Sequence, residues 1–552
     1  MRRLLATVAV VTALVVASTA APTIGTAQTP HSQPITECTT ITDPGVYTLG
    51  TDITNATASP CLDIESSDVV VDGNGHTLTG DGDGVAVNAN QTENRTADGH
   101  ANVTVRDLTV DSWGTGLNFV FAPNATATDL TVTETAIGVQ VGSLDTRPGY
   151  ETASDGAMVR NSTFEHVESA VRTAGSNRIE VVDNAITTYE TVGIRLDTVN
   201  DAIVSGNDVV ATAESGDAIQ VRTSDPAVND GSSDNVVASN RIVNGAITVE
   251  HASDDVTNTH LVDNEVVNGS IAVGLARGVP TQTRVANNTL THSDITVSFA
   301  SAVTIEDNVL TNPGTGPRGS IALRNAGSNT VRNNTISGAE TGVVMSQLAT
   351  DNTITANTIT DTDVGVSLRA NSYNNTIEGN TLADNAIGVE ISFVDSTDDR
   401  ANDIRGNDIM NNTDGIFVRA LDRNLVVEGN DIQHNEHGIT LRASAVCSPT
   451  AEGAAFVAVH DNRIANNTAY GVLNQNADVV NATSNYWGAS DGPSSAADVD
   501  APFADPETGT LANGSGAAVS EDPNSAGQSN VHFDAWLQQA PEDVGAGNQS
   551  AA

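Results

Sequence analysis

The chain of 552 residues contains no lysine, few aromatic residues and very little sulfur. All 23 basic residues are arginine, 3% of the residues are aromatic, and there are only three cysteines and four methionines. The shortage of Met and Cys argues against a carrier of Cu(I), which prefers soft sulfur ligands. With 69 Asp and Glu residues the net charge is −46, so we expect no nucleic acid as a partner, because its phosphates would be repelled.

This acidic, lysine-free composition is typical of proteins adapted to concentrated salt. Hydrated carboxylates keep such a chain in solution, and at molar salt the Debye length falls to about 3 Å, so that like charges barely repel one another. We therefore interpret the acidic surface as a halophilic, solvated surface. The alternative is a surface that binds cations or basic ligands.

The chain has one long apolar run, from Leu4 to Val16, directly after two arginines. The run is too short for a stable membrane span, so residues 1–27 are expected to be a secretory signal peptide that is cleaved after Ala27. A second run of membrane length is lacking in the sequence. We therefore expect a protein without a transmembrane span that is secreted, to the cell surface or the extracellular space.

An extracellular location affects how the cysteines and asparagines are interpreted. Cys38 and Cys61 are expected to form a disulfide at the N-terminal end, which leaves Cys447 free or paired between molecules. Several Asn-x-Thr sequons are candidate glycosylation sites. However, Asn and Thr are also the commonest letters of the repeat described next, which explains most sequons without a glycan. The sequons include those at Asn55, Asn94, Asn287 and Asn333.

Asparagine recurs at a fixed interval of about 23 residues, each time within the phrase apolar-x-x-Asn-x-apolar. A period in this range is typical of a stacked solenoid. Asn tolerates the left-handed backbone that turns a corner, and equivalent amides in successive coils can hydrogen-bond to one another. We therefore predict a structural ladder of Asn161, Asn184, Asn207, Asn240, Asn264, Asn288, Asn308, Asn334, Asn357, Asn380, Asn407, Asn430, Asn462 and Asn485.

Between two such asparagines the apolar residues alternate with polar ones at period 2, in three short runs separated by polar turns. This pattern predicts strands, and three strands in 23 residues fit one coil of a parallel β-helix. The predicted fold is all-β: a single-stranded right-handed parallel β-helix of about 16 coils with caps at both ends. The expected organisation is a signal peptide (1–27), an N-terminal cap (28–66), the β-helix (67–487) and an irregular acidic C-terminal cap or tail (488–552).

A glycine recurs in phase with the asparagines, eight residues after each of several ladder positions. The set is Gly342, Gly365, Gly388, Gly415 and Gly438. Insertions also keep one phase, since they fall mostly between the strand that follows this glycine and the next asparagine. Insertions confined to one edge of a solenoid often mark its binding face, although unconstrained turns also vary in length.

The residues Asp72-Gly73-Asn74-Gly75-His76-Thr77-Leu78 resemble the entry motif of NosD-like β-helix proteins. Asn485-Tyr486-Trp487-Gly488, with Gly492-Pro493 just after, is similar to the exit motif of the same group. The resemblance covers residues 35–540. It implies the right-handed β-helix of the pectate-lyase superfamily, a fold that hosts lyases, hydrolases, epimerases, adhesins and copper-handling accessory proteins.

Two sets of residues are candidate sites. Stacked by repeat phase, Asp414, His434, His437 and His460 are expected to converge, and two imidazoles with a carboxylate suit Zn²⁺ or Cu²⁺ or acid–base work on a sugar. The alternative is that these residues belong to an exposed polar turn and bind no ligand. The second set is a row of arginines at equivalent positions of three coils: Arg369, Arg419 and Arg442. They are candidates to bind acidic sugars, and the alternative is that they are solvent-facing charges at strand ends.

Known catalytic patterns of the superfamily are missing from the sequence. There is no Gly-His-Gly turn of a polygalacturonase and no Asp-Pro-His-Glu of an epimerase. The leading hypothesis is therefore a secreted, non-catalytic β-helix that binds a polysaccharide, or a glycan or protein of the cell surface, along one face. The alternatives are a polysaccharide lyase or hydrolase, for which Ca²⁺ is a usual cofactor, and a NosD-like copper-site accessory protein.

Overall fold

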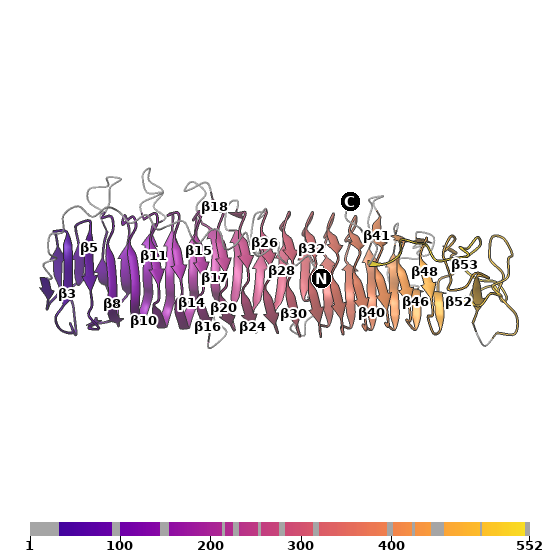
Figure 1. Ribbon diagram of the computed structural model, residues 1–552, viewed down its shortest axis with the longest axis horizontal. Helices are drawn as coiled ribbons and strands as arrows, with labels where there is room; N and C mark the ends of the chain where they lie inside the picture. The colour runs from indigo at the N-terminus through magenta and orange to yellow at the C-terminus, as the bar shows by residue number, and fades with distance from the viewer. Residues whose placement is uncertain are drawn as a thin grey trace, which may run out of the picture.

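All regular structure in the described residues is β, and the strands wind into one long rod (Figure 1). The computed structural model describes residues 33–90, 100–143, 154–211, 216–224, 231–251, 256–274, 282–312, 319–394, 401–421, 425–442, 457–496 and 499–546. The rod is a right-handed parallel β-helix of about 17 turns, which confirms the predicted fold class with about one coil more than expected. The expected signal peptide, most of the inserted loops and Cys447 lie outside the described residues.

One coil consists of three strands, as in the centre of the rod: β32 (Thr330–Arg332), β33 (Thr335–Ser337) and β34 (Thr341–Ser346). Each pairs in parallel with its equivalent in the next coil, which is β35 (Thr353–Thr355), β36 (Thr358–Thr360) or β37 (Val364–Arg369). Paired strands lie about 4.8 Å apart, so every side chain stacks on its equivalent. We call these three positions in a coil the first, second and third strand.

The alternation of apolar and polar residues places one side-chain column of each second strand inside the rod, whereas the third strands contribute two, for example those of Val343 and Met345. On the second strands this column contains Ile336, Ile359 and Leu382, all fully buried. Their neighbours on either side point outward into solvent. The core is thus a stack of aliphatic layers, and the outward residues of the second strands do not contribute to it.

The predicted asparagine ladder runs unbroken through thirteen coils along the corner between the first and second strands. The Nδ2 of each amide donates to the Oδ1 of the next at 2.9–3.0 Å. The prediction was wrong at Asn161, which is exposed on the turn with φ 49°. Ser162 occupies the ladder position there, and its N–H donates to Asn184 Oδ1 at 3.0 Å.

Two further ladders follow the other corners and were not predicted. Asn352 donates to Asn375 at 3.0 Å at the corner before the first strand. Asn412 donates to Asn435 at 3.0 Å at the corner before the third strand. Each corner of the central coils therefore satisfies its buried polar groups with amides from neighbouring coils. The members are Asn329, Asn352, Asn375 and Asn402 in one ladder and Asn385, Asn412, Asn435 and Asn467 in the other.

The glycine column has a steric cause. A Cβ on Gly342 would lie 2.5 Å from the carbonyl oxygen of Gly365, and a Cβ on Gly388 would lie 2.5 Å from that of Gly415. Real Cβ atoms essentially never approach an oxygen so closely, so a side chain at these positions would force neighbouring coils to shift. In other coils the same column contains Ala170, Ala218 and Ser320, so the requirement for glycine is local to the coils from Gly342 to Gly438.

Coil stacking begins inside the range expected to be the N-terminal cap. The strands β1 (Gln33–Ile35) and β2 (Thr39–Ile41) pair with β3 (Gly45–Leu49) and β4 (Leu62–Ile64) respectively, which join the main sheet. The disulfide expected between Cys38 and Cys61 is present there. Among the described residues, no helix is long and apolar enough to cross a bilayer.

At the other end the chain folds back over the last coils (Figure 1). Phe533 and Trp487 are fully buried there, so aromatic side chains close the end of the core. Asp505 anchors this cap, because its carboxylate accepts the backbone N–H groups of Phe533 and Asp534 at 2.8 and 3.0 Å. The tail then runs back along the rod until Gly545 donates its N–H to the carbonyl of Gly429.

Candidate functional site

The outward residues of the third strands form two columns along the rod; arginine occupies two neighbouring rungs of the first column and recurs along the second. We call this surface the arginine face. In the first column Arg172 of β12 (Thr163–Ala174) stacks on Arg195 of β14 (Ala185–Asp197), which stacks on Gln220 of β17 (Asp217–Thr223). In the second column, two residues further along the strands, Arg222 lies between Asp197 and Glu250 of β21 (Ala246–His251).

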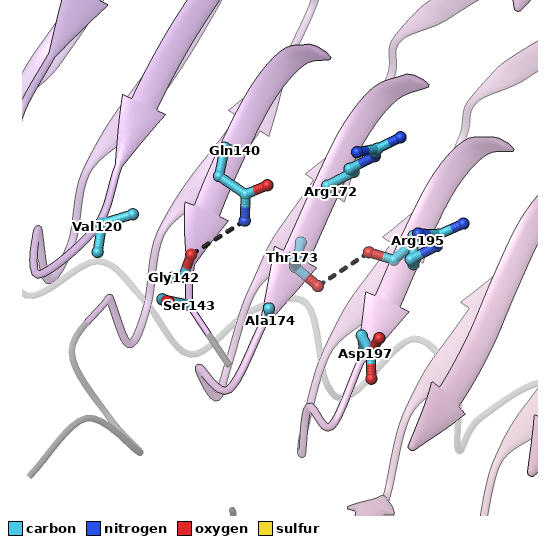
Figure 2. Close-up of a pocket in the computed structure, with 9 residues that line it drawn as sticks. All are labelled: Val120, Gln140, Gly142, Ser143, Arg172, Thr173, Ala174, Arg195 and Asp197. Carbon is cyan, nitrogen blue, oxygen red and sulfur yellow. Dashed lines mark hydrogen bonds between the residues drawn. The ribbon is translucent and has the colours of Figure 1, made fainter. Parts of the chain in front are cut away.

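Arg172, Arg195 and Arg222 thus come from three successive coils and share one surface; we call them the arginine cluster. Figure 2 shows Arg172 and Arg195 side by side on neighbouring strands, beside Gln140 of β10 (Thr126–Gly142). Burial lowers the pKa of the Arg195 guanidinium, and the neighbouring Arg222 and Arg172 charges lower that pKa further. The Asp197 and Glu250 carboxylates oppose this shift of the Arg195 pKa, so the arginine cluster lies among carboxylates as well as cations.

Carboxylate and amide partners hold the guanidinium groups in position. Arg172 donates to Glu168 at 3.0 Å, Arg195 to Gln220 at 2.8 Å, and Arg222 lies 3.1 Å from the Asp197 carboxylate. These contacts use only part of the five N–H donors that each guanidinium carries. The Nε of Arg172 is buried and, among the described residues, has no hydrogen-bond partner.

Two carboxyl groups beside the arginine cluster hold protons more tightly than usual. Burial raises the pKa of Asp217, although the hydrogen bonds that its carboxyl accepts oppose the shift. Burial also raises the pKa of Glu250, helped by the charge of Asp217. The amide of Gln220 bridges the two, donating to Asp217 at 3.0 Å and to Glu250 at 2.7 Å.

A shallow, open depression of about 330 Å³ lies at the N-terminal side of the arginine cluster (Figure 2). Amide, hydroxyl and guanidinium groups line much of it, together with small side chains that leave room at the strand ends. An open, polar depression on the side of a rod suits an extended ligand better than a small enclosed one. The lining residues are Val120, Gln140, Gly142, Ser143, Arg172, Thr173, Ala174, Arg195 and Asp197.

The three arginines proposed from the sequence lie on the same face, nearer its C-terminal end. Arg419 of β43 (Asp414–Leu421) stacks on Arg442 of β46 (His437–Arg442), whereas Ser392 separates Arg419 from Arg369. Arg369 is paired with Glu390 at 3.0 Å. The three arginines therefore occupy one column of outward residues. The column continues to Arg324, which pairs with Ser346 of the next coil.

Sequence reasoning missed the arginine cluster, although a signal was present. Arg172 and Arg195 are 23 residues apart, the period of the ladder, and each follows a buried aliphatic residue of the third strand. The same phase that places Arg369, Arg419 and Arg442 on one face therefore identifies this pair in the early coils.

The four residues expected to hold a metal ion separate into three places. Asp414 and His437 are adjacent, with 3.3 Å between Oδ1 and Nδ1, and the His437 ring stacks on Tyr470. His434 is exposed on the preceding turn. His460 ends a first strand, β47 (Val457–His460), where its ring contacts Asp461 at 3.0 Å. Among the described residues no three His, Cys, Asp or Glu side chains gather to bind a metal.

These features define a structural class, the right-handed parallel β-solenoid. A family model described as "Periplasmic copper-binding protein (NosD)" matches residues 63–282 and 225–396. A second model, "Right handed beta helix region", matches residues 392–487. The first match alone extends over more than half of the chain, which therefore belongs to the NosD family. No curated protein matches the chain.

Several solved structures are similar at low identity. The surface adhesin PfbA of Streptococcus pneumoniae is 13% identical, with 58% of this chain and 81% of that chain covered and a TM-score of 0.34. A PL6 alginate lyase in complex with a trisaccharide is 13% identical (59% and 80% covered, TM-score 0.35). The periplasmic alginate epimerase AlgG is also 13% identical (60% and 72% covered, TM-score 0.29). None of these similarities carries an argument about ligand or activity.

The family description raises the question of copper. Proteins hold copper with imidazole nitrogen and with thiolate or thioether sulfur, usually from three or more side chains at one place. Within the ranges that the structure describes, no such group of His, Cys, Asp and Glu residues occurs, and Asp414 with His437 supplies only two ligands. The described residues therefore do not fit a resident copper ion.

Proposed function

We propose that the protein is an extracellular, non-catalytic β-helix that binds an acidic polysaccharide along the arginine face. The observation that carries this proposal is the arginine cluster, three guanidinium groups from successive coils beside an open polar depression. Planar guanidinium groups recognise carboxylates through paired hydrogen bonds. An extended chain lying along the rod meets one coil about every 4.8 Å, and so contacts several arginines at once.

The net charge of −46 does not oppose this binding in concentrated salt. At molar ionic strength the Debye length is about 3 Å, so a polyanion interacts only with the groups that it touches. On the arginine face those groups are guanidinium, amide and hydroxyl groups, together with carboxylates such as Asp197 and Glu250 that pair with Arg222. Short-range hydrogen bonds therefore select the binding place, while the long-range repulsion by the rest of the surface is screened.

Binding of the whole protein to alginate and polygalacturonate, with neutral dextran for comparison, tests this proposal at the salt concentration where the fold is stable. We expect the double variant Arg172→Gln, Arg195→Gln to bind the polyuronates at least about tenfold more weakly. A charged hydrogen bond contributes roughly 1.5–3 kcal/mol, and about 1.4 kcal/mol corresponds to a factor of ten.

The matched control is Arg106→Gln, which removes an exposed arginine of β8 (Thr104–Asp111) that pairs with Asp72 on a different side of the rod. Equal binding by all three proteins would refute the arginine cluster as the site. Release of unsaturated sugars or new reducing ends from the polyuronates would overturn the non-catalytic part of the proposal.

A further inference from the structure

A second surface of the rod differs from the rest of this acidic molecule because its strands carry no outward charge. It consists of the outward residues of five consecutive second strands: β27 (Thr289–Thr291), β30 (Val309–Thr311), β33, β36 and β39 (Thr381–Ala383). We call it the threonine face. Its ten outward residues are Thr289, Thr291, Val309, Thr311, Thr335, Ser337, Thr358, Thr360, Thr381 and Ala383.

Register places these residues in two straight columns. In one column Thr335 stacks on Thr358, which stacks on Thr381, and in the other Ser337 stacks on Thr360. Val309 has the same shape as threonine and is 43% exposed, so its place in the first column keeps the surface level. The face is therefore a flat lattice of hydroxyl and methyl groups with a rung about every 4.8 Å.

The hydroxyl groups of this lattice are available for a ligand. Within the described part of the chain, none of the eight side-chain hydroxyls on the threonine face has a hydrogen-bond partner, whereas the buried Ser162 donates to Arg160 and the buried Thr362 to Asn385. Such hydroxyls otherwise bond only to water. They can both donate and accept a hydrogen bond, and each threonine adds an apolar methyl group beside its hydroxyl.

The threonine face ends on both sides where a second strand carries an outward carboxylate. The preceding second strand, β24 (Glu265–Val267), begins with Glu265, and the following one, β42 (Asp408–Met410), begins with Asp408. The C-terminal tail covers the latter, where Gly545 lies against the Asp408 carboxylate. The uncharged stretch is therefore confined to five rungs, about 19 Å from first to last.

We propose that the threonine face binds a neutral polysaccharide that lies along the axis of the rod. A neutral chain rich in hydroxyl groups can exchange hydrogen bonds with the lattice, and the C–H faces of its sugar rings can contact the methyl groups. No charge on the strands has to be desolvated. The rung spacing is comparable with the length of one hexose unit, so that successive sugars meet equivalent groups.

Other partners fit this surface less well. An acidic polysaccharide would find no cation on these strands, unlike on the arginine face. A second copy of the chain would bury only a narrow strip of about 19 by 7 Å, far below the roughly 800 Å² per partner of a stable interface. The inference does not depend on the proposed function, because face and ligand differ from those of the arginine face.

Cosedimentation of the whole protein with particles of cellulose and of an insoluble β-1,3-glucan tests the inference. The double variant Thr335→Asp, Thr358→Asp puts two carboxylates at the centre of the face. We expect the wild type to sediment with at least one of these polysaccharides, and the double variant to bind about tenfold more weakly or not at all, because bound carboxylates would lose hydration without a partner.

The matched control is Thr353→Asp, which changes a threonine of the same coil on the neighbouring first strand β35. We expect this variant, and the double arginine variant, to bind the neutral particles like the wild type. Failure of the wild type to bind any neutral particle overturns the inference, as does equal binding by the two threonine variants. Adsorption to ice crystals without binding to polysaccharide would assign the face to ordered water instead and would also overturn it.

Discussion

The asparagine ladder makes a quantitative prediction for the substitution Asn357→Ala in the middle of the rod. The Asn357 amide nitrogen donates to the carbonyl of Val331, to that of Thr355 and to Asn380 Oδ1 at 2.9, 3.0 and 2.9 Å. Its oxygen accepts the backbone N–H and the side-chain amide of Asn334, both at 2.9 Å. Alanine makes none of these five contacts, and the space that it leaves is enclosed by neighbouring coils.

The expected loss follows from which groups remain without a partner. The Asn380 oxygen keeps the backbone N–H of residue 357, and the Asn334 amide keeps the carbonyl of Ile305. The backbone N–H of Asn334 has no alternative acceptor, which costs about 1–3 kcal/mol in a buried place. Adding about 1 kcal/mol for each of one or two net hydrogen bonds lost, we expect a local destabilisation of about 3 kcal/mol.

Hydrogen exchange at the Asn334 amide measures this loss directly. Because a solenoid unfolds in segments, a single global unfolding free energy is a poor readout here. A loss of 3 kcal/mol corresponds to about a hundredfold faster exchange at that amide. The control is Thr358→Ala on the adjacent exposed position, for which we expect less than a threefold change. Unchanged protection of the Asn334 amide in the Asn357→Ala protein would refute the ladder as a source of stability.

Two further predictions concern the backbone and the cap. Gly388→Ala should destabilise the coils around it by roughly 1–3 kcal/mol, since its Cβ would lie 2.5 Å from the Gly415 carbonyl oxygen; unchanged hydrogen exchange in those coils contradicts this. Burial alone would raise the pKa of Asp505, but backbone N–H bonds outweigh it and lower the pKa. The resulting stability is present above about pH 4 and is lost as pH falls through the lowered value. The protection factor of the Phe533 amide, which is the exchange rate of an unfolded chain divided by that of the folded protein at the same pH, should therefore fall in acid, whereas Asp505→Asn should abolish this pH dependence.

The sequence was sufficient for the fold because the fold depends on positions that recur. A buried hydrogen-bonding side chain is needed at each ladder corner, and the coils from Gly342 to Gly438 also need glycine at the bend into the third strand. Asn and Gly therefore recur at the period of the coil. The residue before each ladder asparagine has a left-handed backbone, for example Asn333 at φ 57° and Gly379 at φ 61°. This requirement accounts for Asn-Asn-Thr at residues 333–335: a corner residue, a ladder residue and an outward strand residue, without reference to a glycan.

The errors in the ladder have the same origin. Asn161 fits the phrase and the interval, yet the coil there is one residue shorter, and serine can supply the buried hydrogen bonds. Spacing alone cannot distinguish the exposed corner residue from the buried one beside it. The second and third ladders were visible in principle, since Asn352 lies five residues before Asn357 and Asn412 lies five after Asn407. These two ladders are shorter than the first, so their period is weaker in the sequence.

The candidate sites were harder to predict because adjacent sequence positions diverge at a corner. His434 and His437 are three residues apart, but the buried ladder residue Asn435 lies between them and turns the chain. His434 therefore stays on the turn while His437 joins the third strand. His460 belongs to another side of the coil altogether. Repeat spacing identifies a column only when the two residues also lie on equivalent strands of their coils, as Arg172 and Arg195 do.

The same logic explains why the two proposed ligand surfaces lie where they do. Inward positions and corners are fixed by packing and by buried hydrogen bonds, so a solenoid can vary its chemistry only at outward strand positions. Those positions repeat every coil, and a ligand that repeats on a similar length can use many weak contacts at once. In a chain with a net charge of −46, three clustered arginines and five uncharged rungs are the departures that packing does not require. A polymer running parallel to the rod can exploit both surfaces, acidic sugars on one and neutral sugars on the other.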